Sequence, residues 1–133
     1  MADNLTDTAE NAALNWTLGN ASTGPTGDIK VALVTVAGSD SAPGTEVTGG
    51  SYARLTADFA AASGGATSNE ADLVWEDMPA ATVVGVELWD SAGSPVRWWY
   101  GPLTDSEGDP APKTLDAGDD FKIAAGSLTI TLG

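Results

Sequence analysis

The sequence contains no cysteine and no histidine, and only five of its 133 residues are lysine or arginine. Without cysteine the chain cannot form a disulfide, a thiolate metal site or a cysteine nucleophile. Without histidine it lacks the commonest general base and the commonest metal ligand. Because so little reactive chemistry is available, we expect that the protein is not an enzyme and that it binds no cofactor.

Nineteen acidic residues oppose the five basic ones, and the formal net charge is −14. Binding to nucleic-acid phosphates requires clustered lysine and arginine, and so does docking on an anionic membrane surface. No apolar run approaches the roughly 20 residues of a spanning helix, and residues 1–4 lack the positive region of a secretion signal. We therefore expect no nucleic acid or membrane among the partners, and synthesis in the cytoplasm.

Hydrophobic residues make up 42% of the chain and include five tryptophans, enough for a core of its own. This content argues against global disorder, although the charge alone would allow it. The length suits one domain.

The first twenty residues have a helical pattern. Asp7 and Glu10 have the spacing of an N-cap followed by a capping box, and Gly19 is a typical stop signal. The apolar positions that follow recur at helical spacing: Ala9, Ala12, Ala13 and Trp16. The pattern predicts a helix over Asp7–Leu18, with Leu5 just outside it as a possible hydrophobic staple.

From Asp28 onward the hydrophobic period changes to two, which is typical of β-strands. The expected strands are short: 29–36, 46–48, 52–59, 73–76, 82–89, 96–100, 113–115, 121–123 and 128–132. Residues 60–69 are expected to form a turn and residues 90–94 a hairpin loop. The spacing of turns predicts a mainly β fold, a single antiparallel β-sandwich of jelly-roll or Greek-key type. Residues 1–20 would form an N-terminal arm with the short helix, and residues 21–133 the sandwich domain.

Three carboxylates alternate along one loop, at Asp105, Glu107 and Asp109. A turn can direct such groups at Ca²⁺, which prefers six to eight oxygen ligands. Gly108 lies too early for an EF-hand, and no glutamate occupies the closing position. Further ligands would require a second loop to touch the first, through Asp116, Asp119 and Asp120. Solvated loop charges are the simpler interpretation, and we assign no metal.

Four more acidic residues flank the strand at 73–75: Glu70, Asp72, Glu76 and Asp77. A glycosidase also uses two carboxylates, one of them with a raised pKa. Because alternate residues of a strand share a face, a solvent-facing stripe of Asp72 and Glu76 is the simpler interpretation. No serine has a histidine partner, and no phosphate-binding glycine motif is present.

Three large aromatic residues follow one another at Trp98, Trp99 and Tyr100. Strand geometry would place Trp98 and Tyr100 on one side and Trp99 on the other. Both sides then need cover, one from the core and the other from the helix, a loop or a partner chain. Tryptophan is enriched in interface hot spots, whereas a carbohydrate-binding platform is a further alternative.

Several segments in order resemble a family of small virion proteins of tailed bacteriophages. The resemblance rests on LTDTAENA at 5–12, GTEVTGGSYAR at 44–54, FAAASGG at 59–65, YGPLT at 100–104, KTLDAGD at 113–119 and AGSLTITL at 125–132. Members are described as tail fibre, minor tail, minor capsid or head-decoration proteins. The resemblance implies a structural role in the virion, after synthesis in the host cytoplasm, and carries over no catalytic residue.

Within that family, we expect a capsid decoration or minor capsid protein that stabilises the particle, because a fibre shaft would show repeats. The alternative is a tail fibre or minor tail protein with a receptor- or glycan-binding role. The expected partners are the major capsid protein or tail proteins, with self-association, as a trimer by analogy. The candidate contact residues are Leu5, Leu14, Trp16, Trp98, Trp99 and Tyr100.

Overall fold

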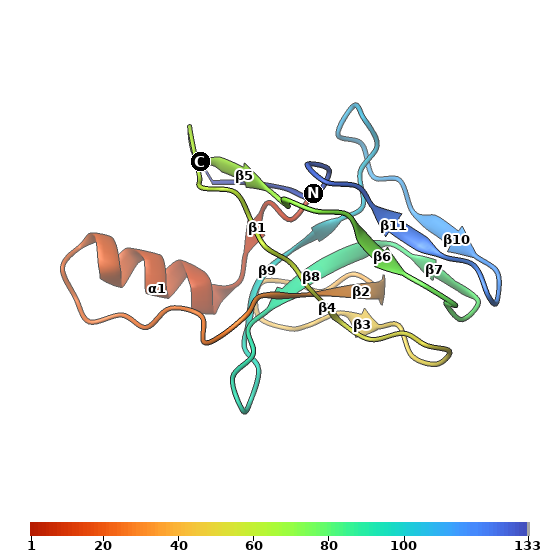
Figure 1. Ribbon diagram of the computed structural model, residues 1–133. Coiled ribbons are helices and arrows are strands. Elements are labelled where there is room, and N and C mark those ends of the chain that lie inside the picture. Colours follow the sequence, from red (N-terminus) through yellow and green to blue (C-terminus); the bar gives the residue numbers. More distant parts are fainter. Residues whose placement is uncertain (133) are drawn as a thin grey trace.

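The computed structural model describes residues 1–132 and is mainly β, with one helix near the N-terminus (Figure 1). The elements are β1 (Asn4–Leu5), α1 (Asp7–Thr17), β2 (Lys30–Val36), β3 (Thr45–Glu46), β4 (Leu55–Thr56), β5 (Ala66–Ser68), β6 (Leu73–Trp75), β7 (Ala81–Val83), β8 (Gly85–Trp89), β9 (Arg97–Pro102), β10 (Lys113–Leu115), β11 (Phe121–Ile123) and β12 (Thr129–Thr131).

One larger sheet forms the first layer. Its strand order is β1-β9-β8-β2-β3, with β4 also paired to β2, and all its pairings are antiparallel. The residues from Val31 to Val34 in β2 are buried on both faces, which agrees with the continuous apolar sequence of this strand. A strand without a polar face belongs inside a sheet, and β2 has neighbours on both of its edges.

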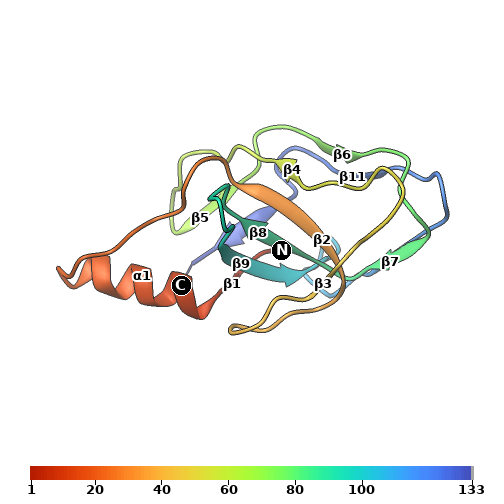
Figure 2. The same cartoon turned by 90° about the horizontal axis from the view of Figure 1, so that it is seen from below.

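The second layer consists of three two-stranded pairs, β7–β10, β6–β11 and β5–β12. Along the chain, each of these pairs encloses the next, and the innermost pair is β8–β9 of the larger sheet. Together they form one long, interrupted hairpin whose turn is the loop after Trp89. A long hairpin folded over into two layers is the arrangement of a jelly roll. In Figure 2, β6 and β11 of the second layer lie above β8 and β9 of the larger sheet.

The core lies between these two layers. The larger sheet contributes Leu33 and Leu88, and the short pairs contribute Trp75, Phe121 and Ile130. The rings of Trp75 and Phe121 pack with their centroids 5.7 Å apart. The expected mainly β, antiparallel fold with a short N-terminal helix is therefore confirmed, and within residues 1–132 the strands do not close into a barrel.

The strand boundaries differ from the predicted ones at the points where the chain changes layer. The predicted strand 82–89 is two strands, because β7 pairs in the second layer and β8 in the first, with the change at Val84. The predicted turn 60–69 contains β5, and the predicted strand 52–59 is reduced to β4. The last two strands do not pair with each other, since β11 joins β6 and β12 joins β5.

The helix begins at Asp7 as predicted, but its N-cap lies one residue earlier than the sequence signal indicated. The N-cap is Thr6, whose hydroxyl accepts a hydrogen bond from the Ala9 N–H at 3.2 Å, so the prediction of Asp7 as the cap was wrong. Thr6 is preferred because its hydroxyl also donates to the Arg97 carbonyl oxygen at 2.9 Å, a tertiary contact that no local pattern reveals. The helix ends at Thr17, with Leu18 as the C-cap, close to the predicted end.

The first five residues pack into the sandwich. Strand β1 pairs with β9, Ala2 has no exposed surface, and the Ala2 N–H donates to the Thr129 carbonyl oxygen at 3.1 Å. Gly101 allows this close packing, because a Cβ there would lie 1.9 Å from the Met1 carbonyl oxygen. The division of the chain at residue 20 remains a prediction.

Candidate interaction surface

Helix α1 and the segment that returns from it to β2, residues 7–27, form an arm that projects from the sandwich (Figures 1 and 2). We call these residues the helical arm. Only Ala9 of the helix is fully buried. An isolated helix of three turns is marginal in water, so the arm depends on the contacts that hold its two ends.

The N-terminal end of the arm, where the chain leaves the sandwich, is held by Thr6 and Asp40. The Thr6 N–H donates to the Trp98 carbonyl oxygen, and the Asp7 N–H donates to the Asp40 carbonyl oxygen, each at 3.1 Å. The Asp40 carboxylate accepts a hydrogen bond from the Tyr100 hydroxyl. This bond and burial raise the pKa of Tyr100 to about 12. The loop that carries Asp40 therefore fixes the direction in which the helix leaves the sheet.

That loop is held in turn by a buried ion pair. Arg97 and Glu87 are 3.0 Å apart, with side chains only 6% and 2% exposed. Glu87 also accepts a hydrogen bond from the Gly44 N–H at 2.6 Å, and Arg97 donates to the Ser39 carbonyl oxygen. Buried charges are stable only when they are paired and fully hydrogen-bonded, and this pair meets that requirement through the loop.

The C-terminal end of the arm, where the chain returns to β2, is held by Asp90, in the loop between β8 and β9. Its carboxylate accepts hydrogen bonds from the Thr26 N–H at 3.2 Å and from the Trp98 indole N–H at 3.1 Å. Burial acts to raise the pKa of Asp90, but these bonds and those from Val96 and Ala92 outweigh it and lower the pKa. The arm is therefore anchored at both ends while its middle stands free.

A groove of about 590 Å³ separates the helix from the sandwich. Ala9, Ala12, Ala13 and Trp16 border it on the helical side, which is the face predicted from their spacing. Trp98 and Trp99 border it on the side of the sheet. Because the helical side consists mostly of alanine, the helix does not fill the space between itself and the two tryptophans.

The groove and the part of the arm from Asn11 onward are uncharged in a strongly acidic protein. None of the residues that line the groove is charged, and the chain has no charged residue from Asn11 to Gly27. The acidic residues of α1, Asp7 and Glu10, lie in its first turn. This surface thus differs from the rest of the chain, since all nineteen acidic residues lie outside the groove and outside residues 11–27.

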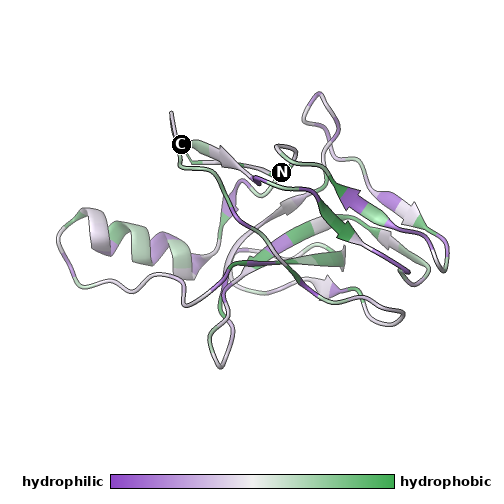
Figure 3. Ribbon diagram, in the orientation of Figure 1, coloured by the Kyte–Doolittle hydropathy of each residue, from purple (hydrophilic) through white to green (hydrophobic). Residues whose placement is uncertain are grey.

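The arm also exposes large apolar side chains. Leu14 is 57% exposed, Trp16 76% and Leu18 73%, and Figure 3 shows apolar bands along α1. These are three of the six large hydrophobic residues that are exposed among residues 1–132. Concentrated apolar exposure of this kind marks an interaction site more often than scattered single residues do.

The predicted contact residues come together only in part. Leu5 is half-buried and borders the groove with Trp16, Trp98 and Trp99, whereas Leu14 lies on the outer side of the helix. Tyr100 is half-buried and bonded to Asp40, away from the groove. Whether these residues contact another protein stays a prediction.

A β-bulge changes the placement of the aromatic residues. Leu88 pairs with Trp99 but Trp89 pairs with Arg97, which makes Trp98 the additional residue in β9. Simple alternation places Trp98 and Trp99 on opposite sides, whereas here both border the groove. Trp98 is only 8% exposed, so its cover comes from the chain itself, one of the predicted alternatives.

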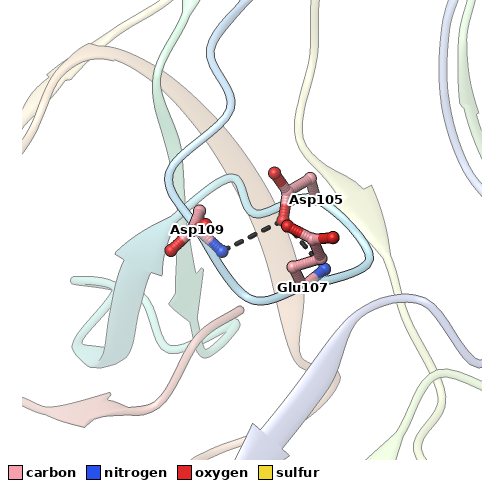
Figure 4. Close-up of side chains that lie close together, drawn as sticks. All are labelled: Asp105, Glu107 and Asp109. Atoms are coloured by element: carbon pink, nitrogen blue, oxygen red, sulfur yellow. Dashed lines mark hydrogen bonds between the residues drawn. The ribbon is translucent and has the colours of Figure 1, made fainter.

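The acidic loop brings three carboxylates together (Figure 4). Oxygen atoms of Asp105, Glu107 and Asp109 lie within 4.8 Å of one another, and all three residues are exposed. One Asp105 oxygen accepts hydrogen bonds from the Glu107 and Asp109 N–H groups, at 2.9 and 3.1 Å, and so shapes the turn. With one oxygen from each residue, the cluster supplies three of the six to eight oxygens that Ca²⁺ prefers.

The other acidic residues proposed as additional ligands are used elsewhere. Asp119 accepts a hydrogen bond from the Asp116 N–H at 2.8 Å, and Asp120 accepts one from the Asp77 N–H at 3.0 Å. Among the described residues, no other acidic side chain joins the cluster of Asp105. The two loops therefore do not combine their carboxylates into one cluster.

Asp72, the carboxylate immediately before β6, lacks the signature of a general acid. Asp72 accepts a hydrogen bond from the Ala125 N–H at 2.8 Å and lies 3.0 Å from the Lys122 ammonium. These contacts lower the pKa of Asp72, whereas a general acid requires a raised one. Asp72 is thus one partner of a surface ion pair with Lys122, which agrees with a solvent-facing stripe.

Sequence patterns did not identify the residues that hold the arm. Asp90 was recognised only as part of a turn, and Asp40 lies in a loop of small residues without a distinctive motif. Their partners are 64 and 60 positions away, at Thr26 and Tyr100. A turn motif gave a weak signal for Asp90, and nothing local gave one for Asp40.

Comparison with known proteins gives one result. A family model described as "Podophage GP4 fiber I protein gp80" matches residues 4–131, which is nearly the whole chain. The match includes the arm, the groove and both layers of the sandwich. No curated protein sequence matches the chain significantly. Among residues 1–132 no helix has the length and apolar character needed to cross a bilayer.

Proposed function

The chain belongs to the podophage GP4 fiber I protein gp80 family, and on this premise we propose that it is a structural component of the tail fibres of a tailed phage. In this role it binds neighbouring tail proteins and further copies of itself and performs no reaction. The observation that carries the proposal is the anchored helical arm, uncharged from Asn11 onward, beside an open apolar groove. A surface held in place before binding loses little conformational entropy when a partner docks.

The family description changes the order of the two structural roles that we expected. Capsid decoration was the leading expectation, but the matching family is named for a fibre protein, which supports the alternative better. The lack of sequence repeats does not oppose a fibre role, since a compact domain can serve as one module among several in a fibre.

The acidic surface suits assembly within a virion. The protein has a net charge of −14 and is therefore repelled by packaged or released DNA. Contacts with protein are favoured over contacts with nucleic acid. The contacts we propose would use the surface that carries no charge. Buried Trp98 argues against a glycan platform built on that ring.

Fractionation of purified virions tests the location. Particles are separated into heads and tails, and an antibody against the recombinant chain is used in immunogold labelling. We expect label on fibres of the tail fraction. Label confined to heads would instead support capsid decoration, and absence from purified particles would contradict a structural role altogether.

A further inference from the structure

Two apolar surfaces of the arm face in different directions. Ala9, Ala12, Ala13 and Trp16 lie on the side of α1 that borders the groove. Leu14 and Leu18, four positions apart, lie on the other side of the arm and border none of its hollows. We call Leu14 and Leu18 the ridge. The ridge cannot reach the groove of its own chain, because the helix lies between them.

We propose that the ridge of one copy docks in the groove of the next copy, so that the protein associates head to tail through its helical arm. This inference rests on the proposed function and names the partner of the same surface. The groove supplies Trp98 and Trp99 on one side and alanines on the other, and the ridge supplies two exposed leucines.

Charge identifies a second copy as the occupant. Two copies with a net charge of −14 each repel one another over most of their surfaces. Close contact is least costly where neither surface carries charge, and the arm from Asn11 to Gly27 and the groove meet that condition. A basic partner would instead be expected to place its charges against carboxylates, which the groove lacks.

The arrangement of the two surfaces fixes the kind of assembly. An interface between two different patches of the same chain is heterologous, and it produces a ring if the rotation closes or a filament if it does not. Each copy in such an assembly uses its ridge once and its groove once. A symmetric dimer would need one patch that is complementary to itself.

Sedimentation velocity of the full chain at increasing concentration and salt tests the proposal first. We expect association that becomes stronger as salt screens the repulsion between acidic copies, whereas ionic contacts would weaken. The double variant Leu14→Asn/Leu18→Asn should raise the dissociation constant about tenfold or more. Val74→Thr is the matched control, because Val74 is 39% exposed on β6, away from the arm, and its variant should associate like wild type.

Mixing two variants tests the head-to-tail geometry. Ala13→Glu places a charge in the groove, whereas the ridge variant leaves the groove intact. Each variant alone should associate at least about tenfold more weakly than wild type, and an equimolar mixture should form a one-to-one complex through the single intact ridge and the single intact groove. Near-UV circular dichroism checks that both variants are folded, which their half-exposed or exposed positions allow.

Several results would overturn the inference: a wild-type chain that stays monomeric at millimolar concentration, a ridge variant that associates like wild type, or a mixture that forms no complex. These outcomes are separate from the test of the proposed function. A monomeric chain found on tail fibres would refute only the contact between copies. An associating chain that is absent from virions would refute only the structural role.

Discussion

At the residue scale, the protein has only two tyrosines, and both have raised pKa values. Burial and the hydrogen bond to Glu46 raise the pKa of Tyr52, and the bond to Asp40 raises that of Tyr100 to about 12. Neutral Tyr100 donates that bond, so its contribution to stability is complete below pH 10. The contribution is lost as the pH rises through 12.

Absorbance titration at 295 nm measures this effect directly. We expect little phenolate near pH 10 while the chain is folded, and a lower pKa for Tyr100 in the Asp40→Asn variant. If half of the phenolate absorbance appeared by pH 10.5 with an unchanged circular dichroism spectrum, the assignment of the Tyr100 bond would be wrong.

The two arginine ion pairs should differ in their contributions to stability. Arg97→Met leaves Glu87 buried without a partner, which should lower the free energy of unfolding by about 3–5 kcal/mol. The comparison is Arg54→Met, which should cost less, because the side chains of Arg54 and Glu46 are 26% and 28% exposed and water can solvate Glu46 after the change. Urea unfolding followed by tryptophan fluorescence gives both values, and equal losses would contradict the distinction.

At the scale of elements, two substitutions test whether α1 is capped by Thr6, which also contacts β9, or by Asp7, which has only the local sequence signal. Thr6→Ala removes a hydroxyl that accepts from Ala9 and donates to β9, so it should destabilise α1 by about 1–2 kcal/mol. Asp7→Ala removes a charge from the first turn and should cost about 0.3–1 kcal/mol. Hydrogen exchange of the α1 amides should therefore rise more in the Thr6 variant, and the reverse order would restore Asp7 as the cap.

The acidic loop should be independent of calcium. Its turn is made by hydrogen bonds to Asp105, and its carboxylates are exposed. The melting temperature in millimolar Ca²⁺ should therefore match that in EDTA to within about 1 °C, since a ligand stabilises only the state that binds it. A rise of several degrees on adding Ca²⁺, and not on adding Na⁺ of equal ionic strength, would show a bound cation.

Sequence patterns predicted those helices and strands that are determined by residues close together in the sequence. The periods of 3.6 and 2 indicated α1, β2, β6 and the hairpin of β8 and β9, and the groove-facing alanines of α1 follow from spacing alone. Pairing partners such as β6 and β11 were not predictable, because they lie far apart in the chain. The bulge at Trp98 and the anchoring by Asp40 likewise depend on contacts between distant segments.

At the scale of the whole molecule, the fold combines an acidic body with an arm that is uncharged from Asn11 onward. The nested hairpin and its core stabilise the body, while bonds to Asp40 and Asp90 hold the arm at an angle that leaves one groove open. This division explains how a chain with a net charge of −14 can still offer an apolar surface to other proteins. The sequence resemblance and the family match agree on a phage structural protein.

A cryo-electron microscopy reconstruction of the virion tests the central claim most directly. We expect density for this two-layered fold in the tail fibres, with the helical arm buried against a neighbouring protein. Density for the fold on the capsid lattice, or in the fibres with the arm and groove open to solvent, would contradict the account.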